Sequence, residues 1–256
     1  MGPATKEQAK VIGRRHFSGG VVRLDLESSA VAQAARAGQF VMVRVKADLG
    51  YDPLLRRPFS IHDCQGKVIS LLVKVVGRGT ALLADLEEGD PLDLLGPLGR
   101  PFPSLNGPKI LVGGGMGVAP LLFLARQAGG EGGLRLRLGA ATATELLAVE
   151  EFEDLGLIPD LYTEDGSAGK KGLVTKGLAQ ELGRSPGTVF ACGPPGMLQA
   201  VAGAARKSGV RAYLSLEAHM GCGLGACLGC AVKKSGGGYA RVCTEGPVFE
   251  ATEVEM

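Results

Sequence analysis

The spacing of the cysteines near the end of the chain restricts what this sequence can form more than any other feature. The chain has six cysteines among 256 residues, and four of them lie between residues 222 and 243. They follow the pattern Cys-x4-Cys-x2-Cys, then twelve further residues, then the last cysteine. Secreted disulfide scaffolds are usually smaller and more evenly studded with cysteine, whereas clustered thiols in a reducing compartment suggest metal. The sequence therefore predicts a metal centre near the carboxyl terminus.

This spacing is typical of an iron–sulfur centre. Plant-type [2Fe–2S] clusters use an x4, x2 and distant-fourth arrangement of thiolates, because soft sulfur stabilises the charge on iron. Small residues between the cysteines let the backbone wrap closely and direct amide N–H groups at the cluster. Structural zinc, the alternative, usually takes two Cys-x2-Cys-like pairs, and only one pair here has that spacing. We expect a [2Fe–2S] cluster with the ligands Cys222, Cys227, Cys230 and Cys243.

The composition argues against several classes of partner. A net charge of +2 gives no electrostatic reason to expect nucleic acid or an anionic membrane. The chain has no tryptophan, and only 5% of its residues are aromatic, so platforms for stacking bases are not expected. The first eight residues lack the apolar core of a signal peptide, and the longest apolar run, 118–125, is too short to span a bilayer. We expect a cytoplasmic protein.

Two patterns of secondary structure follow one another along the chain. The first hundred residues contain short β-branched runs at 21–26, 40–45 and 68–76, separated by Gly and Pro, which predict a small antiparallel barrel. A short helix is expected over 80–86. From residue 108 onward, strands and helices alternate, which indicates a parallel sheet with helices on its faces. The expected strands are 109–112, 134–140, 159–163 and 188–192, and the expected helices are 119–128, 145–155, 174–182 and 197–208.

These patterns divide the chain into three parts. Residues 1–102 are expected to form the barrel, and residues 103–212 a doubly wound α/β domain. Residues 213–256 have no room for another layer of strands and helices. We expect the cysteines to hold this last segment together.

Two glycine-rich turns in the α/β part suggest a nucleotide site. The run at 112–120, with four glycines, lies between a strand and a helix, where a doubly wound fold binds nucleotides. Bare glycines let a pyrophosphate approach the backbone, although tight strand–helix packing also favours glycine. A second turn, at 191–197, is expected beside the first at the carboxyl edge of the sheet. The predicted nicotinamide-binding residues are Gly114, Gly115, Gly117, Cys192, Gly193 and Pro194, with Cys192 as a neighbour of the ring and not a nucleophile.

A second pair of motifs, in the first part of the chain, suggests a flavin. Arg57 can neutralise a phosphate, and Ser60 can hydrogen-bond a flavin ring or a diphosphate oxygen. About twenty residues later, Gly79 and Thr80 can open a short helix whose N–H groups face a pyrophosphate. Arg-x-x-Ser alone is equally typical of a solvated turn. Ahead of an α/β domain and a cluster, the two motifs together favour a flavin site.

The order of these motifs resembles the ferredoxin–NADP reductase superfamily. Arg-Pro-Phe-Ser, Gly-Thr, Gly-Gly-Gly-Met-Gly-Val-Ala-Pro and Cys-Gly-Pro-Pro-Gly-Met occur in that family's order over about residues 10–205. Its members have a Greek-key flavin-binding barrel followed by a nicotinamide-binding α/β domain. The run at 216–230, with Cys-Thr-Glu-Gly-Pro-Val-Phe at 243–249, is similar to the electron-transfer subunits of class 1B dihydroorotate dehydrogenases, the PyrK family. The resemblance then spans nearly the whole chain.

The resemblance implies cofactor contacts and a partner. The residues carried over to FAD are Arg57, Pro58, Phe59, Ser60, Leu72, Val73, Lys74, Gly79 and Thr80. Phe59 departs from the family, which commonly has an aliphatic residue or tyrosine at that position. The implied function is to pass electrons between the FMN of a dihydroorotate dehydrogenase catalytic subunit and NAD+, through a [2Fe–2S] cluster and FAD, in pyrimidine biosynthesis. The implied assembly is a heterotetramer with two copies of each subunit.

Features within the chain agree with a catalytic partner elsewhere. We find no acid–base constellation that would act on dihydroorotate, and we expect Glu217, His219 and Met220 to have packing roles. The strand end at 139–142 offers no arginine for a 2′-phosphate, which favours NAD over NADP. The alternatives are the small subunit of NADH-dependent ferredoxin:NADP oxidoreductase, a sulfide dehydrogenase subunit and, in a different class, a zinc-binding interaction protein.

Overall fold

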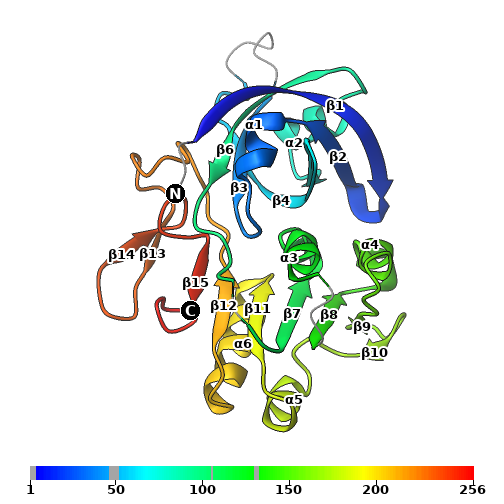
Figure 1. Cartoon of the computed structure of the whole chain (residues 1–256), viewed down its shortest axis with the longest axis vertical. Helices are drawn as coiled ribbons and strands as arrows, with labels where there is room; N and C mark the ends of the chain where they lie inside the picture. The colour runs from blue at the N-terminus through cyan, green and yellow to red at the C-terminus, as the bar shows by residue number, and fades with distance from the viewer. Residues whose placement is uncertain (1–3, 46–51, 105, 130–132) are drawn as a thin grey trace.

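Six antiparallel strands close into a barrel at the amino-terminal end of the molecule (Figure 1). The computed structural model describes residues 4–45, 52–104, 106–129 and 133–256. The barrel strands, in chain order, are β1 (Thr5–Phe17), β2 (Val21–Glu27), β3 (Phe40–Arg44), β4 (Arg57–Gln65), β5 (Val68–Lys74) and β6 (Pro91–Leu98). They neighbour one another in the order β1-β2-β5-β4-β3-β6, and closure leaves no free sheet edge. The short helices α1 (Ser29–Ala34) and α2 (Arg78–Ala84) accompany the barrel.

A seven-stranded sheet follows the barrel. Its order is β10-β9-β8-β7-β11-β12-β15, and all its pairs except β12 with β15 are parallel. The strands are β7 (Lys109–Gly114), β8 (Leu134–Ala140), β9 (Asp160–Thr163), β10 (Lys170–Lys171), β11 (Thr188–Cys192), β12 (Ala212–Ser215) and β15 (Val248–Glu250). The helices are α3 (Leu121–Ala128), α4 (Val149–Glu153), α5 (Leu178–Arg184) and α6 (Pro195–Lys207). The expected fold class, a barrel followed by an α/β sheet, is confirmed.

The direction of strand addition reverses at the centre of this sheet. The chain adds β8 and β9 on one side of β7, then returns to the other side with β11 and β12. Ligands of open α/β sheets bind at such a reversal, outside the carboxyl ends of the strands. The two glycine turns follow β7 and β11, so they lie at the reversal.

The last segment, which we expect the cysteines to hold together, is also joined to the sheet. β12 ends at Ser215, and β15 pairs antiparallel with it, with Leu214 opposite Phe249. An unpaired edge strand exposes N–H and C=O groups, so this pairing satisfies an edge that the α/β domain would otherwise leave open. Residues Ala231–Lys233 (β13) and Tyr239–Arg241 (β14) form a separate two-stranded ribbon.

Strand β3 is buried on both faces, and its outer face is the surface on which the cysteine segment packs. Val41 and Val43 point into the barrel core, and Phe40 and Met42 pack outward in a second cluster. Side chains alternate between faces along a strand, so an all-apolar strand indicates a cover on each side. The outer cover is the carboxyl-terminal segment. Its cluster comprises Phe40, Met42, Leu98, Cys230, Ala240, Val242, Cys243, Phe249 and Val254.

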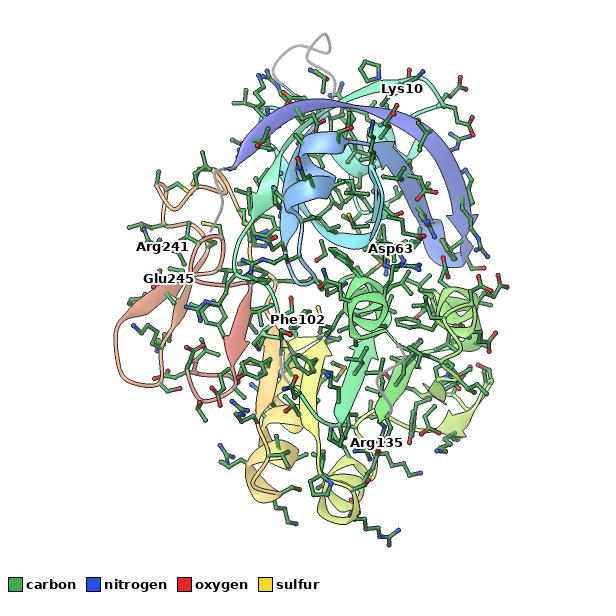
Figure 2. The ribbon with its side chains drawn as sticks, in the orientation of Figure 1. Lys10, Asp63, Phe102, Arg135, Arg241 and Glu245 are labelled. Carbon is green, nitrogen blue, oxygen red and sulfur yellow. The ribbon has the colours of Figure 1, made fainter. Side chains whose placement is uncertain are left out.

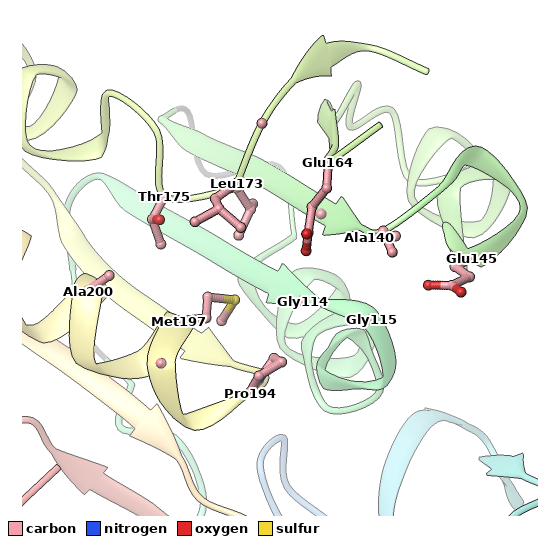
Figure 3. Close-up of a pocket in the computed structure, with 15 residues that line it drawn as sticks. Gly114, Gly115, Ala140, Glu145, Glu164, Leu173, Thr175, Pro194, Met197 and Ala200 are labelled. Carbon is pink, nitrogen blue, oxygen red and sulfur yellow. The ribbon is translucent and has the colours of Figure 1, made fainter. Parts of the chain in front are cut away.

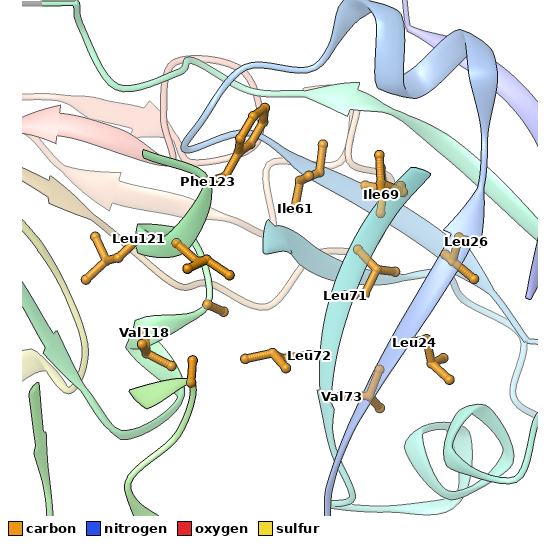
Figure 4. Close-up of a cluster of buried hydrophobic side chains, with 14 of the residues drawn as sticks. Leu24, Leu26, Ile61, Ile69, Leu71, Leu72, Val73, Val118, Leu121 and Phe123 are labelled. Atoms are coloured by element: carbon orange, nitrogen blue, oxygen red, sulfur yellow. The ribbon is translucent and has the colours of Figure 1, made fainter. Parts of the chain in front are cut away.

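The barrel and the sheet share a core and are joined by polar contacts. Leu24, Ile61 and Leu71 of the barrel belong to the same buried cluster as Leu121 and Phe123 of α3 (Figure 4). Full burial of each such side chain contributes roughly 1.5–3 kcal/mol.

Ion pairs cross the same boundary. Asp63 on β4 receives two hydrogen bonds from Arg126 of α3, at 2.7 and 2.8 Å, and lies at the barrel rim that faces this helix (Figure 2). Arg23 of β2 lies 3.5 Å from Glu151 of α4. The flavin motif and the first glycine turn are therefore fixed relative to each other.

Among the described residues, no helix is long and apolar enough to cross a membrane.

Candidate functional site

The two glycine turns meet at the carboxyl edge of the sheet, as the sequence predicts. Cys192 at the end of β11 is the register partner of Gly113 on β7. A Cβ added at Gly117 would overlap the Cys192 carbonyl and lie 2.5 Å from the Gly193 nitrogen. A Cβ at Gly114 would lie 2.6 Å from the Met197 sulfur. Only glycine therefore permits the backbones to approach this closely.

A cavity of about 540 Å³ opens above these turns (Figure 3). Its volume is that of an ordinary cofactor pocket. Gly114, Gly115 and Pro194 line it, whereas the other three nicotinamide candidates, Gly117, Cys192 and Gly193, are not among its lining residues. Glu145 and Glu164 are its charged lining residues, and no lysine or arginine of the described chain lines it. Neither carboxylate was among the predicted site residues, because the two come from loops after different strands.

Cys192 is buried below the cavity, and its thiol is held neutral. Burial raises its pKa to about 12, with a further contribution from the charge of Glu217. A neutral thiol is a poor nucleophile, in agreement with the expected neighbouring role. The packing expectation is wrong for Glu217 and His219, which are exposed because the chain leaves the sheet after Ser215. It is confirmed for Met220, which packs against the outer cluster on β3.

The flavin motif lies on a strand and not in a solvated turn. Residues 57–60 begin β4, and the guanidinium of Arg57 packs against Gly79, where an added Cβ would lie 2.7 Å from Nη2. The fold thus brings together two motifs that are separated in sequence. Arg57 has no ion-pair partner among the described residues, whereas its neighbour Arg56 is paired with Asp93 at 2.7 Å. Arg57 is therefore the arginine that can serve a phosphate.

Thr80 stabilises the turn before α2. Its hydroxyl accepts hydrogen bonds from the amides of Val76 and Gly77, at 2.8 and 3.1 Å, and donates to the Gly77 carbonyl. Val75 and Val76 are exposed beside it, with Val76 at 77%. An apolar rim next to a cationic side chain and a glycine cradle fits a flavin nucleotide, because its rings are apolar and its diphosphate is anionic.

The four predicted ligands lie in two pairs. Cys222 and Cys227 are close enough to influence each other's protonation, and so are Cys230 and Cys243. No three His, Cys, Asp or Glu side chains in the described part of the chain converge as ligands of a single ion. In a [2Fe–2S] cluster each iron takes two protein ligands, so two pairs fit this centre.

The two pairs have different environments. Cys230 and Cys243 are 3% and 1% exposed, and burial, together with Cys230, raises the pKa of Cys243 to about 11. Cys222 and Cys227 lie nearer the surface. The backbone amide of Cys227, then that of Leu224, lowers the pKa of Cys222 to about 6. The donor set therefore offers N–H groups to an outer thiolate, which is the environment that an iron–sulfur centre requires.

An arginine braces the loop around the cysteines. Arg241 on β14 donates from Nη1 to the Gly225 carbonyl at 3.2 Å and pairs with Glu245 at 3.0 Å (Figure 2). Gly225 has φ +81°, a conformation that favours glycine. The glycines between the cysteines thus allow a tight loop that a side chain from the neighbouring ribbon stabilises.

Comparison with protein families identifies both ends of the site. Residues 217–255 match the iron–sulfur cluster binding domain of dihydroorotate dehydrogenase B, and residues 111–203 match the oxidoreductase NAD-binding domain. The match regions contain the four cysteines and the two glycine turns, respectively.

Comparison with whole proteins extends the match to nearly the full chain. The chain is 39% identical to the dihydroorotate dehydrogenase B (NAD(+)) electron transfer subunit of Caldanaerobacter subterraneus, over 97% of this chain and 98% of the relative. It is 41% identical to the subunit of the same name from Geobacillus thermodenitrificans, over 98% and 99%.

Solved structures match the fold. A chain of the NADH-dependent reduced ferredoxin-NADP oxidoreductase superposes with a TM-score of 0.86 at 32% identity, covering 100% of this chain and 91% of that one. The ferredoxin reductase of carbazole 1,9a-dioxygenase superposes with a TM-score of 0.65 at 21% identity, covering 81% and 67%, and shares the fold.

Proposed function

The chain belongs to the family of dihydroorotate dehydrogenase B (NAD(+)) electron transfer subunits, and from this premise we propose how its residues serve that task. It is the electron transfer subunit of an NAD-dependent oxidoreductase, with FAD, a [2Fe–2S] cluster and NAD as cofactors. A subunit of this kind works with a catalytic partner subunit. We propose that this partner carries FMN, oxidises dihydroorotate in pyrimidine biosynthesis and assembles with the chain as two copies of each.

The observation that carries the proposal is the position of β3. Its Phe40 and Met42 are register partners of Ser60 and Pro58 on the flavin strand β4. Its outer face is covered by the cysteine segment. One strand therefore separates the flavin motif from the cluster ligands, and the flavin strand is joined by Asp63 to the helix that follows the first glycine turn.

Each end of this arrangement has a distinct task. FAD exchanges hydride with the nicotinamide and single electrons with the cluster, so it converts one kind of transfer into the other. We propose that Gly114, Gly115 and Pro194 accept the dinucleotide against bare backbone, and that the neutral Cys192 packs below the ring. Arg57 would neutralise the flavin diphosphate. The further FAD contacts proposed are Pro58, Phe59, Ser60, Leu72, Val73, Lys74, Gly79 and Thr80.

The partner is proposed to bind over the outer cysteine pair. Leu224 and Leu228 are 55% and 61% exposed and flank the exposed Cys227. Leu228 also has φ +59°, an unfavourable conformation for a residue with a side chain. Large exposed apolar side chains on a strained loop are typical of binding surfaces. A partner that covered them would lie next to the cluster.

The test is reconstitution with defined subunits. The holoprotein is mixed with a purified dihydroorotate dehydrogenase catalytic subunit, and orotate-dependent oxidation of NADH is followed at 340 nm. We expect activity only with both subunits and none with the variant Cys243→Ser. Activity of the chain alone on orotate, or none with the added subunit, would contradict the proposal.

The bifurcating oxidoreductase is the second candidate, because its chain superposes over the whole length of this one. On this reading the partner would be the large subunit of an NADH-dependent ferredoxin-NADP oxidoreductase. The same assay with that large subunit in place of the dihydroorotate dehydrogenase subunit separates the two candidates. Activity restored only by the oxidoreductase subunit would favour the second.

A further inference from the structure

A methionine of the barrel supports the cysteine loop from below. Met42 is fully buried, yet it lies on the outer face of β3, away from the barrel core. Its outer-cluster companions include the two inner ligands, Cys230 and Cys243. A flexible thioether side chain fills irregular gaps well, which suits a position between a flat strand and a loop.

Met42 packs directly on the backbone between the first ligand and Leu224. A Cβ added at Gly223 would lie 2.6 Å from Cγ of Met42, 3.1 Å from its Sδ and 3.3 Å from Cδ1 of Leu98. Gly223 is buried and has φ +71°, so its backbone is both left-handed and in close contact with the barrel. The turn at Gly223 therefore has no freedom to move toward β3.

The peptide that Met42 supports carries a hydrogen bond to a ligand. The amide of Leu224, which follows Gly223, donates to the sulfur of Cys222 at 3.3 Å. Hydrogen bonds to cluster sulfurs are among the factors that set the reduction potential of an iron–sulfur centre. Without Met42 the Gly223 turn could sink toward β3, and this N–H would turn away from the sulfur.

We propose that Met42 is a positioning residue for electron transfer: by supporting the Gly223 turn, it holds the Leu224 amide on Cys222 and so sets the potential of the cluster. The inference rests on the proposed function, since it takes these cysteines as cluster ligands. Met42 is also the register partner of Pro58 in the flavin motif. The same strand position thus fixes the ligand loop relative to the flavin strand.

The experiment compares Met42→Ala with Met42→Leu and with Leu94→Ala in the purified holoprotein without a partner. Leu94 is equally buried, but it points into the barrel core and belongs to a different cluster. The readouts are the midpoint potential of the cluster by redox titration, its EPR spectrum after reduction, and the rate of iron loss to a chelator. Flavin content and thermal stability are measured in parallel.

We expect Met42→Ala to shift the midpoint potential and the EPR g-values, and to lose iron about tenfold faster, as is usual when support around a metal ligand is removed. Met42→Leu should restore most of the wild-type values, because it refills the gap. Leu94→Ala should lower stability to a similar extent and leave the cluster signals unchanged. If Met42→Ala fails to hold a cluster while Leu94→Ala retains it, a partial shift in Met42→Leu supports the proposal.

Two results would overturn the proposal. One is an unchanged potential and spectrum in Met42→Ala, and the other is an equal change in Leu94→Ala, which would mean that barrel stability alone matters. These signals come from the isolated chain. Failure of the proposed function, by contrast, would appear as an inactive mixture of wild-type subunits, so the two failures are distinguishable.

Discussion

The nicotinamide cavity and the cysteine segment use opposite chemical means at the two ends of one molecule. At the cavity, function depends on side chains that are absent: Gly117 and Gly114 leave room for neighbouring backbone and for a ligand. At the cysteine segment, function depends on side chains that are present, four thiols in two pairs. The first site therefore depends on how closely the folded backbone segments approach one another. The second depends on the spacing of the cysteines along the sequence, which can be read directly.

The two ends are also attached to the barrel differently. The cysteine segment lies on an apolar face, where Phe40, Met42 and Leu98 pack against it. The helix after the first glycine turn shares the barrel's apolar core, but it is also held through polar groups, the Asp63–Arg126 pair and the buried His62, whose Nδ1 lies 2.8 Å from the Ala119 carbonyl oxygen. The first attachment should be insensitive to pH, and the second should not.

The largest expected effect is the loss of the cluster on removal of an inner ligand. Cys230→Ser replaces a soft thiolate by a hydroxyl, and we expect the visible absorbance and the EPR signal of the cluster to disappear. Reduction of FAD by NADH should persist, because the cavity is built by other residues. Cys64→Ser is the matched control, since this half-buried free thiol is not one of the four predicted ligands. Cluster signals that survive in Cys230→Ser would show that Cys230 is not a required ligand, and would contradict the dependence of this site on its four thiols.

The next effect tests the end that depends on absent side chains. Gly117→Ala places a Cβ on the Cys192 carbonyl, and we expect a loss of about 3 kcal/mol in unfolding free energy from overpacking, with weakened NADH binding. Gly196→Ala is the control, because it lines the same cavity and has open space around it. Urea unfolding and fluorescence titration measure the two quantities. Equal behaviour of both variants would show that close approach is not what the glycine provides.

The third prediction concerns pH and the polar attachment. Burial lowers the pKa of His62 from 6.5 to about 4, and Arg23 lowers it further, while the Ala119 carbonyl, Asp63 and Asp25 oppose this. Between these two values the unfolded chain binds a proton that the native chain does not, so stability falls as the pH drops through this window. We expect the protein to be roughly 2 kcal/mol less stable at pH 5 than at pH 8.

Urea unfolding at the two pH values, with His62→Gln as the variant, measures this effect. Glutamine keeps an N–H donor for the Ala119 carbonyl and does not titrate, so the difference between pH 5 and pH 8 should shrink. Met42→Leu, on the apolar attachment, should keep the wild-type pH dependence. A pH dependence that is unchanged in His62→Gln would assign it to another group and remove the contrast between the attachments.

The success of sequence reasoning follows the same division. The fold class could be predicted because strand–helix alternation and β-branched runs are local patterns. β1, β4 and β6 were missed, because polar residues, Pro or Gly in β1 (Thr5–Phe17), β4 (Arg57–Gln65) and β6 (Pro91–Leu98) hide their alternation. The cover on β3 had a signal in its all-apolar run at 40–43, which requires burial on both faces. Nothing in the sequence could place Met42 under Gly223, because that contact depends on how the last segment packs on the barrel.

The smallest expected effect asks whether the cavity also uses a side chain. Glu164 lies at the end of β9 and points into the cavity from its rim (Figure 3). A 2′-phosphate would bring negative charge near this carboxylate, and at an exposed site such repulsion amounts to about 1 kcal/mol. We therefore expect Glu164→Gln to raise kcat/KM for NADPH about fivefold relative to NADH. Asp165→Asn is the control, because this adjacent carboxylate does not line the cavity.

The outcome decides how strict the contrast between the two ends is. If Glu164→Gln changes the preference and Asp165→Asn does not, the nicotinamide end binds the shared part of the dinucleotide with backbone and discriminates with a single charge. An unchanged preference in Glu164→Gln, with Glu145→Gln measured beside it, would leave discrimination to Glu145 or to the shape of the backbone. If neither glutamate variant changes the preference, the shape of the backbone selects the dinucleotide without a charged side chain. Only the cysteine end would then depend on side-chain chemistry.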